Sequence, residues 1–458
     1  MMREPPFASL ERPLPMELAG ARALVLGLGD TGLSAARWIE SAGGKARVAD
    51  TRAAPPRAGD FRGELHTGTF DSSLLEGIGL LCVSPGLPLD QPIVLEAKAR
   101  GIPIVGDIEL FAWHVRGKTR SKIIAITGTN GKTTVTSLAR HLLAHAGVDC
   151  ASAGNIGPAA LAALLERARP PEAWVLELSS YQLETTWSLA PDAAALLNVT
   201  EDHLDRYAGM GDYAAAKARI FAGAGVQVLN RDDPRSMALA PAGAPRMTFG
   251  LDAPSRVMDF GVRDGHLVQG DTFVLPVDEL SIHGLHNVAN ALAACALACA
   301  MGVPPKALAR PLREFRGLPH RLELVATLRG VEWYDDSKGT NVGATVAALA
   351  GLRKPVYLIA GGEGKGQDFA PLVLPVSQHA RKVLLIGRDA PLIGRALASS
   401  GVPVEQHKSL EDAVAAAARE AVAGEAVLLS PACASFDMFR DYRHRGEAFA
   451  AAVRGLPA

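Results

Sequence analysis

The stretch Gly128–Thr134, with the sequence GTNGKTT, contains the residues best suited to phosphate chemistry. It follows the strand-like run 122–127 and precedes a segment with apolar residues at helical intervals. Backbone amides, a helix N-terminus and Lys132 would therefore converge on a phosphate chain, and Thr133 would be placed to hold Mg²⁺. The loop is shorter than the common GxxxxGK[ST] pattern, because Ile126 stands where the first glycine is expected. We predict a phosphate-binding loop, and a turn without a ligand is the alternative.

Other polar residues follow strand-like runs further along the chain. Glu177 ends one run, and since the carboxyl ends of parallel strands face the ligand crevice, it is suited to bind magnesium. An ordinary strand-end carboxylate is the alternative. Asp202 and His203 follow another run on the same side, which leaves structural and functional roles open for the histidine. Lys217 stands among alanines, where a lysine is usually a solvated charge, so the residues alone indicate a surface position.

A second glycine motif lies near the N-terminus. Gly27, Gly29 and Gly32 spell GxGxxG directly after a strand-like run, and Asp50 closes the next one, which fits the dinucleotide fingerprint. The same geometry serves any nucleotide diphosphate, because the glycines only let backbone approach a phosphate at a helix N-terminus. From this motif alone, nicotinamide or flavin binding, a UDP-type ligand and simple helix packing all remain open.

The elements that position these motifs alternate between strand-like and helical runs, which predicts parallel α/β sheets. At 458 residues the chain is too long for one core. A polar, basic stretch at 114–122 is a candidate linker, and new strand-like runs (VEWYDD, PVYLIAGG, KVLLIG, AVLLSPA) follow an apolar helix around Ala291. We therefore predict three α/β domains: Rossmann-like at 1–116, a P-loop ATPase-like central parallel sheet at 117–316, and Rossmann-like at 317–458.

The composition limits the possible partners. The 47 lysines and arginines almost cancel the 48 aspartates and glutamates, so no basic field would attract nucleic acid or anionic lipid. The first twenty residues contain no signal-peptide run, and the longest near-apolar run, 291–303, is too short to cross a bilayer. We expect a cytoplasmic protein without membrane insertion. No heptad pattern or apolar stripe is evident, which favours a monomer.

Together, TGTNGKTT, VLELSSYQLE, NVTEDHLDRY, AAKARI and HNVANALAA resemble the Mur ligase family, which builds the peptide of bacterial cell-wall precursors. Within that family, further motifs resemble the members that join D-glutamate to UDP-N-acetylmuramoyl-L-alanine: GDIELF, SPGLPL, AGNIG, GLPHRLE, DDSKGTN, GGEGKGQDF and LLSPACASFDMF. The resemblance runs from about Gly27 to Phe449. It implies an ATP- and Mg²⁺-dependent ligase that activates a carboxylate as an acyl phosphate.

The resemblance also implies roles for individual residues. Those implied to bind ATP are Gly128, Thr129, Asn130, Gly131, Lys132, Thr133, Thr134, Asn287, Asn290, Arg321, Asp336 and Lys338. Those implied to hold magnesium are Thr133, Glu177, His203 and, if CO₂ carbamylates it, Lys217. Lys132, Lys217 and His203 are the implied catalytic residues.

The implied substrate contacts fall in the first and third domains, with one in the second. The UDP-substrate residues are Thr31, Asp50, Thr51, Arg52, Ser84, Gly86 and Asn155. The D-glutamate residues are Thr340, Lys365, Ser435 and Phe436. Lysine and hydroxyl donors suit a dicarboxylate.

Three functions remain as hypotheses: this ligase, an NAD-dependent dehydrogenase that relies on the first glycine loop, and a non-catalytic nucleotide-binding scaffold. A dehydrogenase has no use for GTNGKT, Glu177 or DDSKGTN, and a scaffold has no need of metal-site residues. Among the ligases, those that add meso-diaminopimelate, L-lysine or L-alanine are the nearest competitors.

Overall fold

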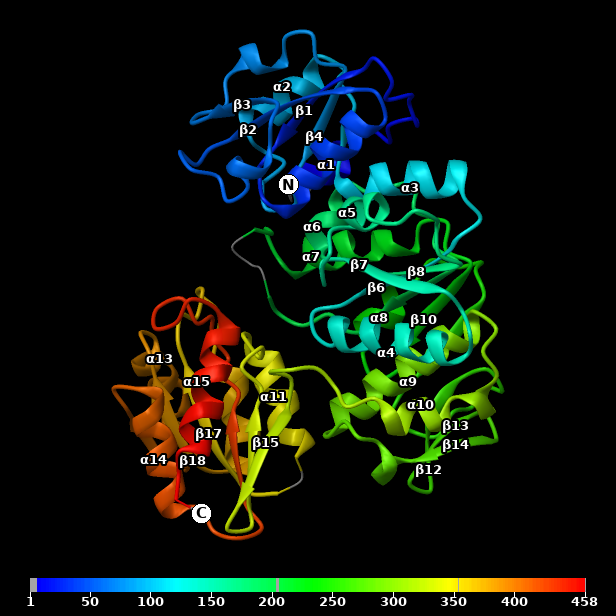
Figure 1. The fold of residues 1–458 in the computed structure, drawn as a ribbon. Coiled ribbons are helices and arrows are strands. Elements are labelled where there is room, and N and C mark those ends of the chain that lie inside the picture. The colour runs from blue at the N-terminus through cyan, green and yellow to red at the C-terminus, as the bar shows by residue number, and fades with distance from the viewer. Residues whose placement is uncertain (1–5, 203–205, 353, 458) are drawn as a thin grey trace.

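The computed structural model describes residues 6–202, 206–352 and 354–457. Within them the chain forms three sheets in succession, and Figure 1 shows them as a central body with the N-terminal and C-terminal bodies beside it. The predicted three-domain α/β architecture is confirmed. The domain limits at residues 117 and 317 stay predictions.

The N-terminal sheet is parallel throughout, in the order β3-β2-β1-β4-β5. Its order reverses between β1 and β4, and in such sheets the ligand crevice lies outside the carboxyl ends at that point. The strands are β1 (Arg22–Leu26), β2 (Lys45–Asp50), β3 (Glu64–Thr67), β4 (Leu80–Val83) and β5 (Ile104–Val105). The helices are α1 (Asp30–Ser41), α2 (Pro92–Ala99) and α3 (Asp107–Lys118).

The central sheet has the order β14-β13-β12-β11-β10-β9-β6-β8-β7 and is parallel from β7 to β12. Its strands are β6 (Lys122–Thr127), β7 (Cys150–Gly154), β8 (Ala173–Glu177), β9 (Ala193–Leu196), β10 (Val226–Asn230), β11 (Arg246–Phe249), β12 (Phe260–Arg263), β13 (His266–Gln269) and β14 (Thr272–Pro276). Its helices are α4 (Lys132–His145), α5 (Ala160–Leu165), α6 (Ser180–Glu184), α7 (Met210–Ala218), α8 (Pro234–Leu239), α9 (Leu285–Ala300) and α10 (Ala309–Glu314).

Two features of this sheet bear on the sequence prediction. The apolar helix expected around Ala291 is α9, which packs against α4 and the sheet. The antiparallel meander β12–β14 was not predicted, because its four- and five-residue strands are too short to show a clear period.

The C-terminal sheet has the order β15-β16-β20-β17-β18-β19 and is parallel except for its edge strand β15. Its strands are β15 (Glu323–Leu328), β16 (Val331–Asp335), β17 (Val356–Gly361), β18 (Ala380–Ile386), β19 (Val404–Gln406) and β20 (Ala426–Leu429). Its helices are α11 (Val342–Gly351), α12 (Val373–His379), α13 (Ala390–Ala396), α14 (Leu410–Glu420) and α15 (Tyr442–Arg454). The four predicted strands correspond to β16, β17, β18 and β20.

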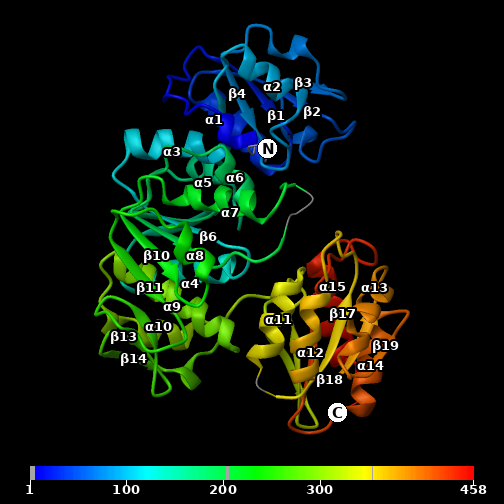
Figure 2. The same ribbon diagram turned by 180° about the vertical axis from the view of Figure 1, so that it is seen from behind.

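The N-terminal and central domains share an apolar core, whereas the C-terminal domain has apolar cores of its own. One cluster runs from the N-terminal sheet through α3 to one face of the central sheet, where the rings of Phe111 and Trp174 lie 5.3 Å apart edge to face. Residues 114–118 of the expected linker form the end of α3, and Arg116 donates to the Leu189 carbonyl. The C-terminal sheet has two clusters of its own. In Figure 2 this sheet lies to one side, joined to the rest mainly beside α9 and α11.

Short 3₁₀ helices occupy Pro6–Ser9, Ala58–Asp60, Ser72–Leu75, Arg219–Phe221, Val277–Glu279, Pro305–Ala307, Ala370–Leu372 and Leu397–Ser399. Among the described residues, no helix combines the length and apolar character needed to span a membrane.

Candidate active site

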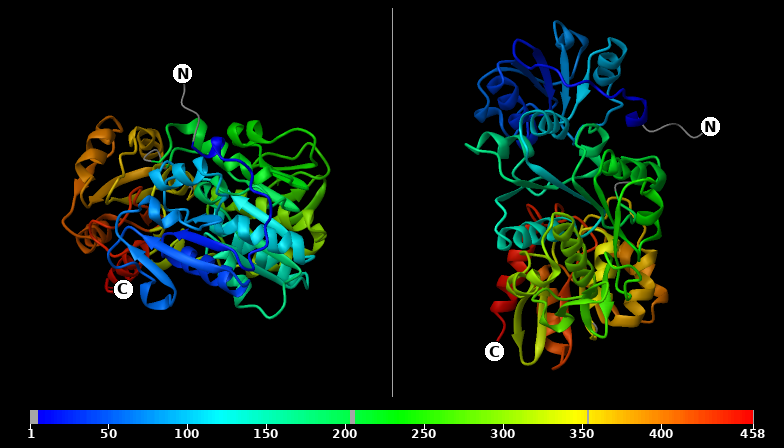
Figure 3. Two further views of the ribbon diagram at one scale, coloured as in Figure 1. Left: turned by 90° about the horizontal axis from the view of Figure 1, so that it is seen from above. Right: turned by 90° about the vertical axis from the view of Figure 1, so that its right-hand side faces the viewer.

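A cavity of about 1960 Å³ is lined by residues of all three domains. The loops after β1 and β4, the loop after β6, the ends of β7 and β8 and several C-terminal loops contribute to it. The views in Figure 3 show the three bodies from above and from the side. The carboxyl ends of parallel strands carry these loops, as expected for ligand sites in α/β sheets.

The predicted phosphate loop has the backbone that such a loop needs. Gly128 and Gly131 have φ angles of 156° and 85°, which side chains rarely allow. A Cβ on Gly131 would also lie 2.4 Å from Asn290 Oδ1. Lys132 is the first residue of α4, and its Nζ donates to the carbonyls of Gly128 and Thr129, both at 2.9 Å. Burial lowers the pKa of Lys132.

Lys217 is only 1% exposed, so its interpretation from the residues alone as a surface charge is wrong. Helix α7 points it into the cavity, where its Nζ donates to Gly128 O at 2.9 Å and lies 4.4 Å from the Tyr213 ring centre. Burial, followed by the nearby charge of Lys132, lowers the pKa of Lys217 well below its usual value. Two amines thus share one carbonyl oxygen, which makes this point of the cavity receptive to an anion.

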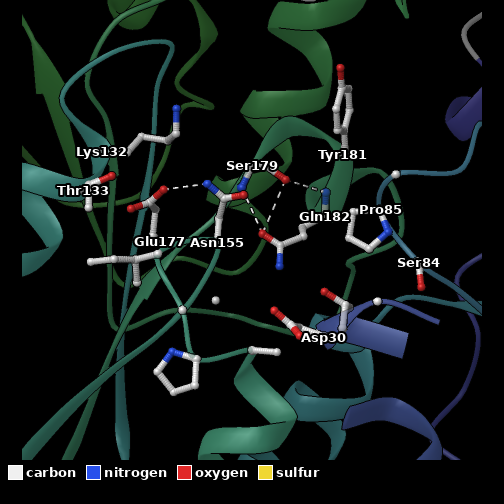
Figure 4. A pocket seen from close by; sticks show the side chains of 18 of the residues that line it. Asp30, Ser84, Pro85, Lys132, Thr133, Asn155, Glu177, Ser179, Tyr181 and Gln182 are labelled. Atoms are coloured by element: carbon white, nitrogen blue, oxygen red, sulfur yellow. Dashed lines mark hydrogen bonds between the residues drawn. The ribbon is translucent and has the colours of Figure 1, made fainter. Parts of the chain in front are cut away.

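Glu177 at the end of β8 has the properties of a metal ligand. It is 2% exposed, and its Oε1 accepts from Asn155 Nδ2 at 2.7 Å, a bond drawn in Figure 4. Its Oε2 is buried and accepts no hydrogen bond from the described residues. A buried carboxylate oxygen left open in this way fits a hard cation such as Mg²⁺. His203, also expected at this site, lies outside the described residues.

Contacts across the domain boundary close one side of the phosphate loop. Arg321 Nη2 donates to Thr133 Oγ1 at 2.6 Å, and burial lowers the pKa of the arginine. Asn341 Nδ2 donates to Asn130 Oδ1 at 3.2 Å and to Asp202 Oδ2 at 3.3 Å. Sequence reasoning missed Asn341, although it belongs to the motif DDSKGTN.

A second cavity of about 320 Å³ adjoins the phosphate loop. Asn287, Asn290 and Thr134 line it from the central domain, and Asp336 and Lys338 from the C-terminal one. Asn290 Nδ2 donates to Asn287 Oδ1 at 3.0 Å. The predicted nucleotide residues of both domains therefore come together here.

Burial changes the charge behaviour of the C-terminal pair in this second cavity. It raises the pKa of Asp336 to about 7, although Ser430 Oγ donates to its Oδ2 at 2.7 Å. Burial, followed by the nearby charge of Arg321, lowers the pKa of Lys338 to about 8. The Lys338 amine lies 3.9 Å from the Tyr442 ring centre.

The N-terminal residues predicted for a UDP moiety line the large cavity: Thr31, Asp50, Thr51, Arg52, Ser84 and Gly86. The Asp50 carboxylate is already engaged, since Leu28 N donates to Oδ2 at 2.7 Å and Arg52 donates to both oxygens. The bond from Arg52 is the main reason that the pKa of Asp50 falls to about 2. Asp50 is therefore placed to orient Arg52 and the glycine loop.

The four predicted D-glutamate residues do not all line the cavity. Thr340 and Lys365 do. Ser435 is buried outside it, and the Phe436 side chain is 68% exposed. A bridge between Glu363 and Ala434 nevertheless holds their loops side by side.

Comparison with known proteins gives one consistent result. Family models match the chain in order: Mur ligase MurD-like N-terminal domain over residues 21–106, Mur ligase middle domain over 126–298, and Mur ligase glutamate ligase domain over 320–433. The UDP-N-acetylmuramoylalanine--D-glutamate ligase of Nitrosospira multiformis is 55% identical, over 97% of each chain. Its namesake from Thiobacillus denitrificans is 51% identical, over 97% of this chain and 98% of its own.

Solved structures show the same fold at much lower identity. MurF from Acinetobacter baumannii superposes with a TM-score of 0.61 at 17% identity, over 95% of this chain and 91% of that one. This likeness concerns the fold alone.

Proposed function

The chain belongs to the Mur ligase family, and from this premise we propose that it joins D-glutamate to UDP-N-acetylmuramoyl-L-alanine with ATP, in peptidoglycan precursor synthesis. The observation that carries the proposal is the single cavity that connects the N-terminal glycine loop, the phosphate loop and the basic C-terminal residues. Three substrates can meet in one such space.

In the proposed reaction, the alanyl carboxylate attacks the terminal phosphate of ATP, releasing ADP and forming an acyl phosphate. The amine of D-glutamate then attacks that carbonyl, loses a proton and displaces phosphate, leaving an amide. Lys132 and the loop amides stabilise charge on the transferred group, which is the main work in phosphoryl transfer. In this proposal Lys338 adds a second cation, and Lys365, which also lines the cavity, receives a carboxylate of the amino acid.

We propose that Thr133 and Glu177 hold Mg²⁺ together with His203 and carbamylated Lys217. When bound, the ion supplies neutralisation of phosphate charge. Arg321 donates to Thr133 in this structure, so the arginine must move before the hydroxyl can serve as a ligand.

Carbamylation of Lys217 is supported by its surroundings. The amine is buried, donates to a neutral carbonyl, and forms no ion pair within the described residues. The ammonium group first gives up a proton, and the neutral amine then attacks CO₂, forming an N–C bond and releasing a second proton. A cation is thus converted into an anion able to ligate a metal. A ¹³C NMR resonance of a carbamate in protein equilibrated with ¹³C-bicarbonate, absent from Lys217→Met, is the expected result.

The activity is tested by phosphate release from ATP and Mg²⁺ with UDP-N-acetylmuramoyl-L-alanine. D-glutamate is compared with L-glutamate, meso-diaminopimelate and no amino acid. Release that requires D-glutamate supports the proposal. Release with another amino acid keeps the ligase chemistry but overturns the D-glutamate assignment, and NADH oxidation without phosphate release would favour the dehydrogenase.

We further propose that the protein acts in the cytoplasm as a monomer, with domain limits near residues 117 and 317. The absence of an overall charge imbalance agrees with small-molecule partners. Sedimentation of the purified protein tests the monomer.

A further inference from the structure

An ion pair at the edge of the nucleotide-substrate region has no role in the chemistry above. Asp30 is the first residue of α1 and lines the large cavity. Figure 4 shows it on the N-terminal side of that cavity, across from Asn155 and Ser179. Arg57 lines the same cavity, and its Nε donates to Asp30 Oδ1 at 2.6 Å.

Stability does not explain the pair. The side chains of Asp30 and Arg57 are 72% and 45% exposed, and ion pairs in such positions typically contribute about 0–1 kcal/mol. The loop that holds Arg57 also has an anchor of its own, because the Arg57 backbone N–H donates to Leu28 O at 3.3 Å. Removal of the side chain therefore leaves the loop attached to the glycine turn.

The negative charge of Asp30 at the start of α1 suggests that its ion pair with Arg57 has a role in ligand binding. A helix N-terminus that follows a glycine loop attracts an anion, yet the Asp30 carboxylate already brings a negative charge to that position. A diphosphate approaching the same helix end would be repelled unless a cation compensates. The cavity-lining charges of this domain are three acids and three bases: Asp30, Asp50, Asp60, Arg37, Arg52 and Arg57.

Arg57 has a donor to spare for a ligand. Its Nε is used by Asp30 and its Nη1 by Asp60 Oδ2, at 3.3 Å. Its Nη2 donates to none of the described residues. Loss of Arg57 would remove that donor and leave the acids of this region in excess by one charge.

We propose that Arg57 is a specificity-determining residue for the nucleotide substrate. It neutralises Asp30 and donates to the diphosphate at the start of α1, so that the cleft selects a nucleoside diphosphate over the uncharged nucleoside. This inference rests on the proposed function and deepens it.

The test is calorimetric titration of the full chain with UDP and with uridine. Arg57→Ala is expected to weaken UDP binding about tenfold, because the diphosphate loses a charge-assisted hydrogen bond and meets an uncompensated Asp30, and to change uridine binding less than about twofold. In the double variant Asp30→Asn/Arg57→Ala, part of the UDP affinity returns, because the uncompensated acid is gone while the lost donor is not replaced. Arg100→Ala, which breaks the Arg100–Glu96 pair in the same domain but outside the cavity, leaves both affinities unchanged.

Kinetics give a second readout. With UDP-N-acetylmuramoyl-L-alanine as the varied substrate, Arg57→Ala raises its KM and leaves kcat and the KM of ATP unchanged. Equal weakening of UDP and uridine, an unchanged UDP affinity, or no recovery in the double variant overturns the inference while leaving the proposed function intact. Wild-type protein that binds neither ligand overturns both.

Discussion

At the scale of single residues, the site depends on side chains whose charge is altered by burial. Lys132 and Lys217 both donate to Gly128 O, and Arg321 and Lys338 line the same cavity from the C-terminal domain. Their pKa values are all lowered, with burial as the first cause. Such perturbed groups gathered in one cavity are typical of a functional site. An incoming polyphosphate relieves the cost of holding these cations together.

Lys338 gives a prediction on pH. Its amine, with a pKa lowered to about 8, is cationic below pH 8 and loses its charge as the pH rises above that value. Because a charged donor contributes about 1.5–3 kcal/mol, kcat/KM for ATP should fall about tenfold or more between pH 7.5 and 9.5. In Lys338→Arg the profile should be flatter, since arginine stays charged. An identical fall in wild type and variant would assign the titration to another group.

Glu177 gives a prediction on the metal. Glu177→Gln keeps an acceptor for Asn155 but removes the negative charge, so kcat should fall about 10²–10³-fold and the Mg²⁺ concentration for half-maximal activity should rise. Glu172→Gln, in an exposed position just before the other end of the same strand, should match wild type in both. Normal Mg²⁺ dependence in Glu177→Gln would remove this residue from the metal site.

At the scale of elements, the conformation of the glycine turn between β1 and α1 depends on individual glycine positions. A Cβ on Gly32 would lie 1.8 Å from the Gly27 carbonyl oxygen, whereas one on Gly29 meets nothing within 4 Å. Of these two glycines, only Gly32 is therefore required by packing. Gly27 is needed for another reason, since its φ is 90°.

Alanine substitutions at Gly32 and Gly29 test this account of the turn. Gly32→Ala must push the turn away from α1, and overpacking of this kind costs about 1–3 kcal/mol. We expect a lower thermal midpoint and weakened UDP binding. Gly29→Ala should leave the thermal midpoint close to wild type, because a Cβ there meets no protein atom within 4 Å. Equal losses of the thermal midpoint in the two variants would contradict this account of the turn.

Helix α3 and the loop after β4 join the first two domains. Arg206 of the central domain, only 13% exposed, donates to Leu87 O in that loop and to Glu184 Oε2, both at 2.9 Å. With the shared apolar core, these contacts hold the N-terminal sheet against the central one. The two domains should thus move as one body.

At the scale of the whole molecule, the C-terminal domain has its own cores and meets the rest through few contacts. Ser435 and Phe436 do not line the cavity in this arrangement, whereas Lys365 does. Rotation of this domain toward the phosphate loop is therefore the motion that would complete an amino-acid site.

Small-angle X-ray scattering tests the motion. The radius of gyration should fall when a non-hydrolysable ATP analogue, Mg²⁺ and UDP-N-acetylmuramoyl-L-alanine are added together. The nucleotide substrate alone should change it little, because the N-terminal and central domains already pack on each other. A radius unchanged by all ligands would mean that D-glutamate binds in the arrangement seen here.

The sequence by itself determined the local features of this protein. The phosphate loop, the glycine turn and four C-terminal strands could be predicted from short-range patterns. Strand and helix periods and glycine spacing depend only on neighbouring residues. The family followed from ordered motifs. The residues of both nucleotide regions were also named in advance, and most of them line the two cavities.

Only the tertiary structure decided which side chains are buried and what they meet. Lys217 stands in an alanine-rich helix like a surface lysine, yet α7 packs it beside Gly128, 89 residues away. Asn341 reaches Asn130 across 211 residues, and Arg57 meets Asp30 because the loop after β2 folds over the glycine turn. Burial and long-range pairing arise from packing of distant elements, which local periodicity does not encode.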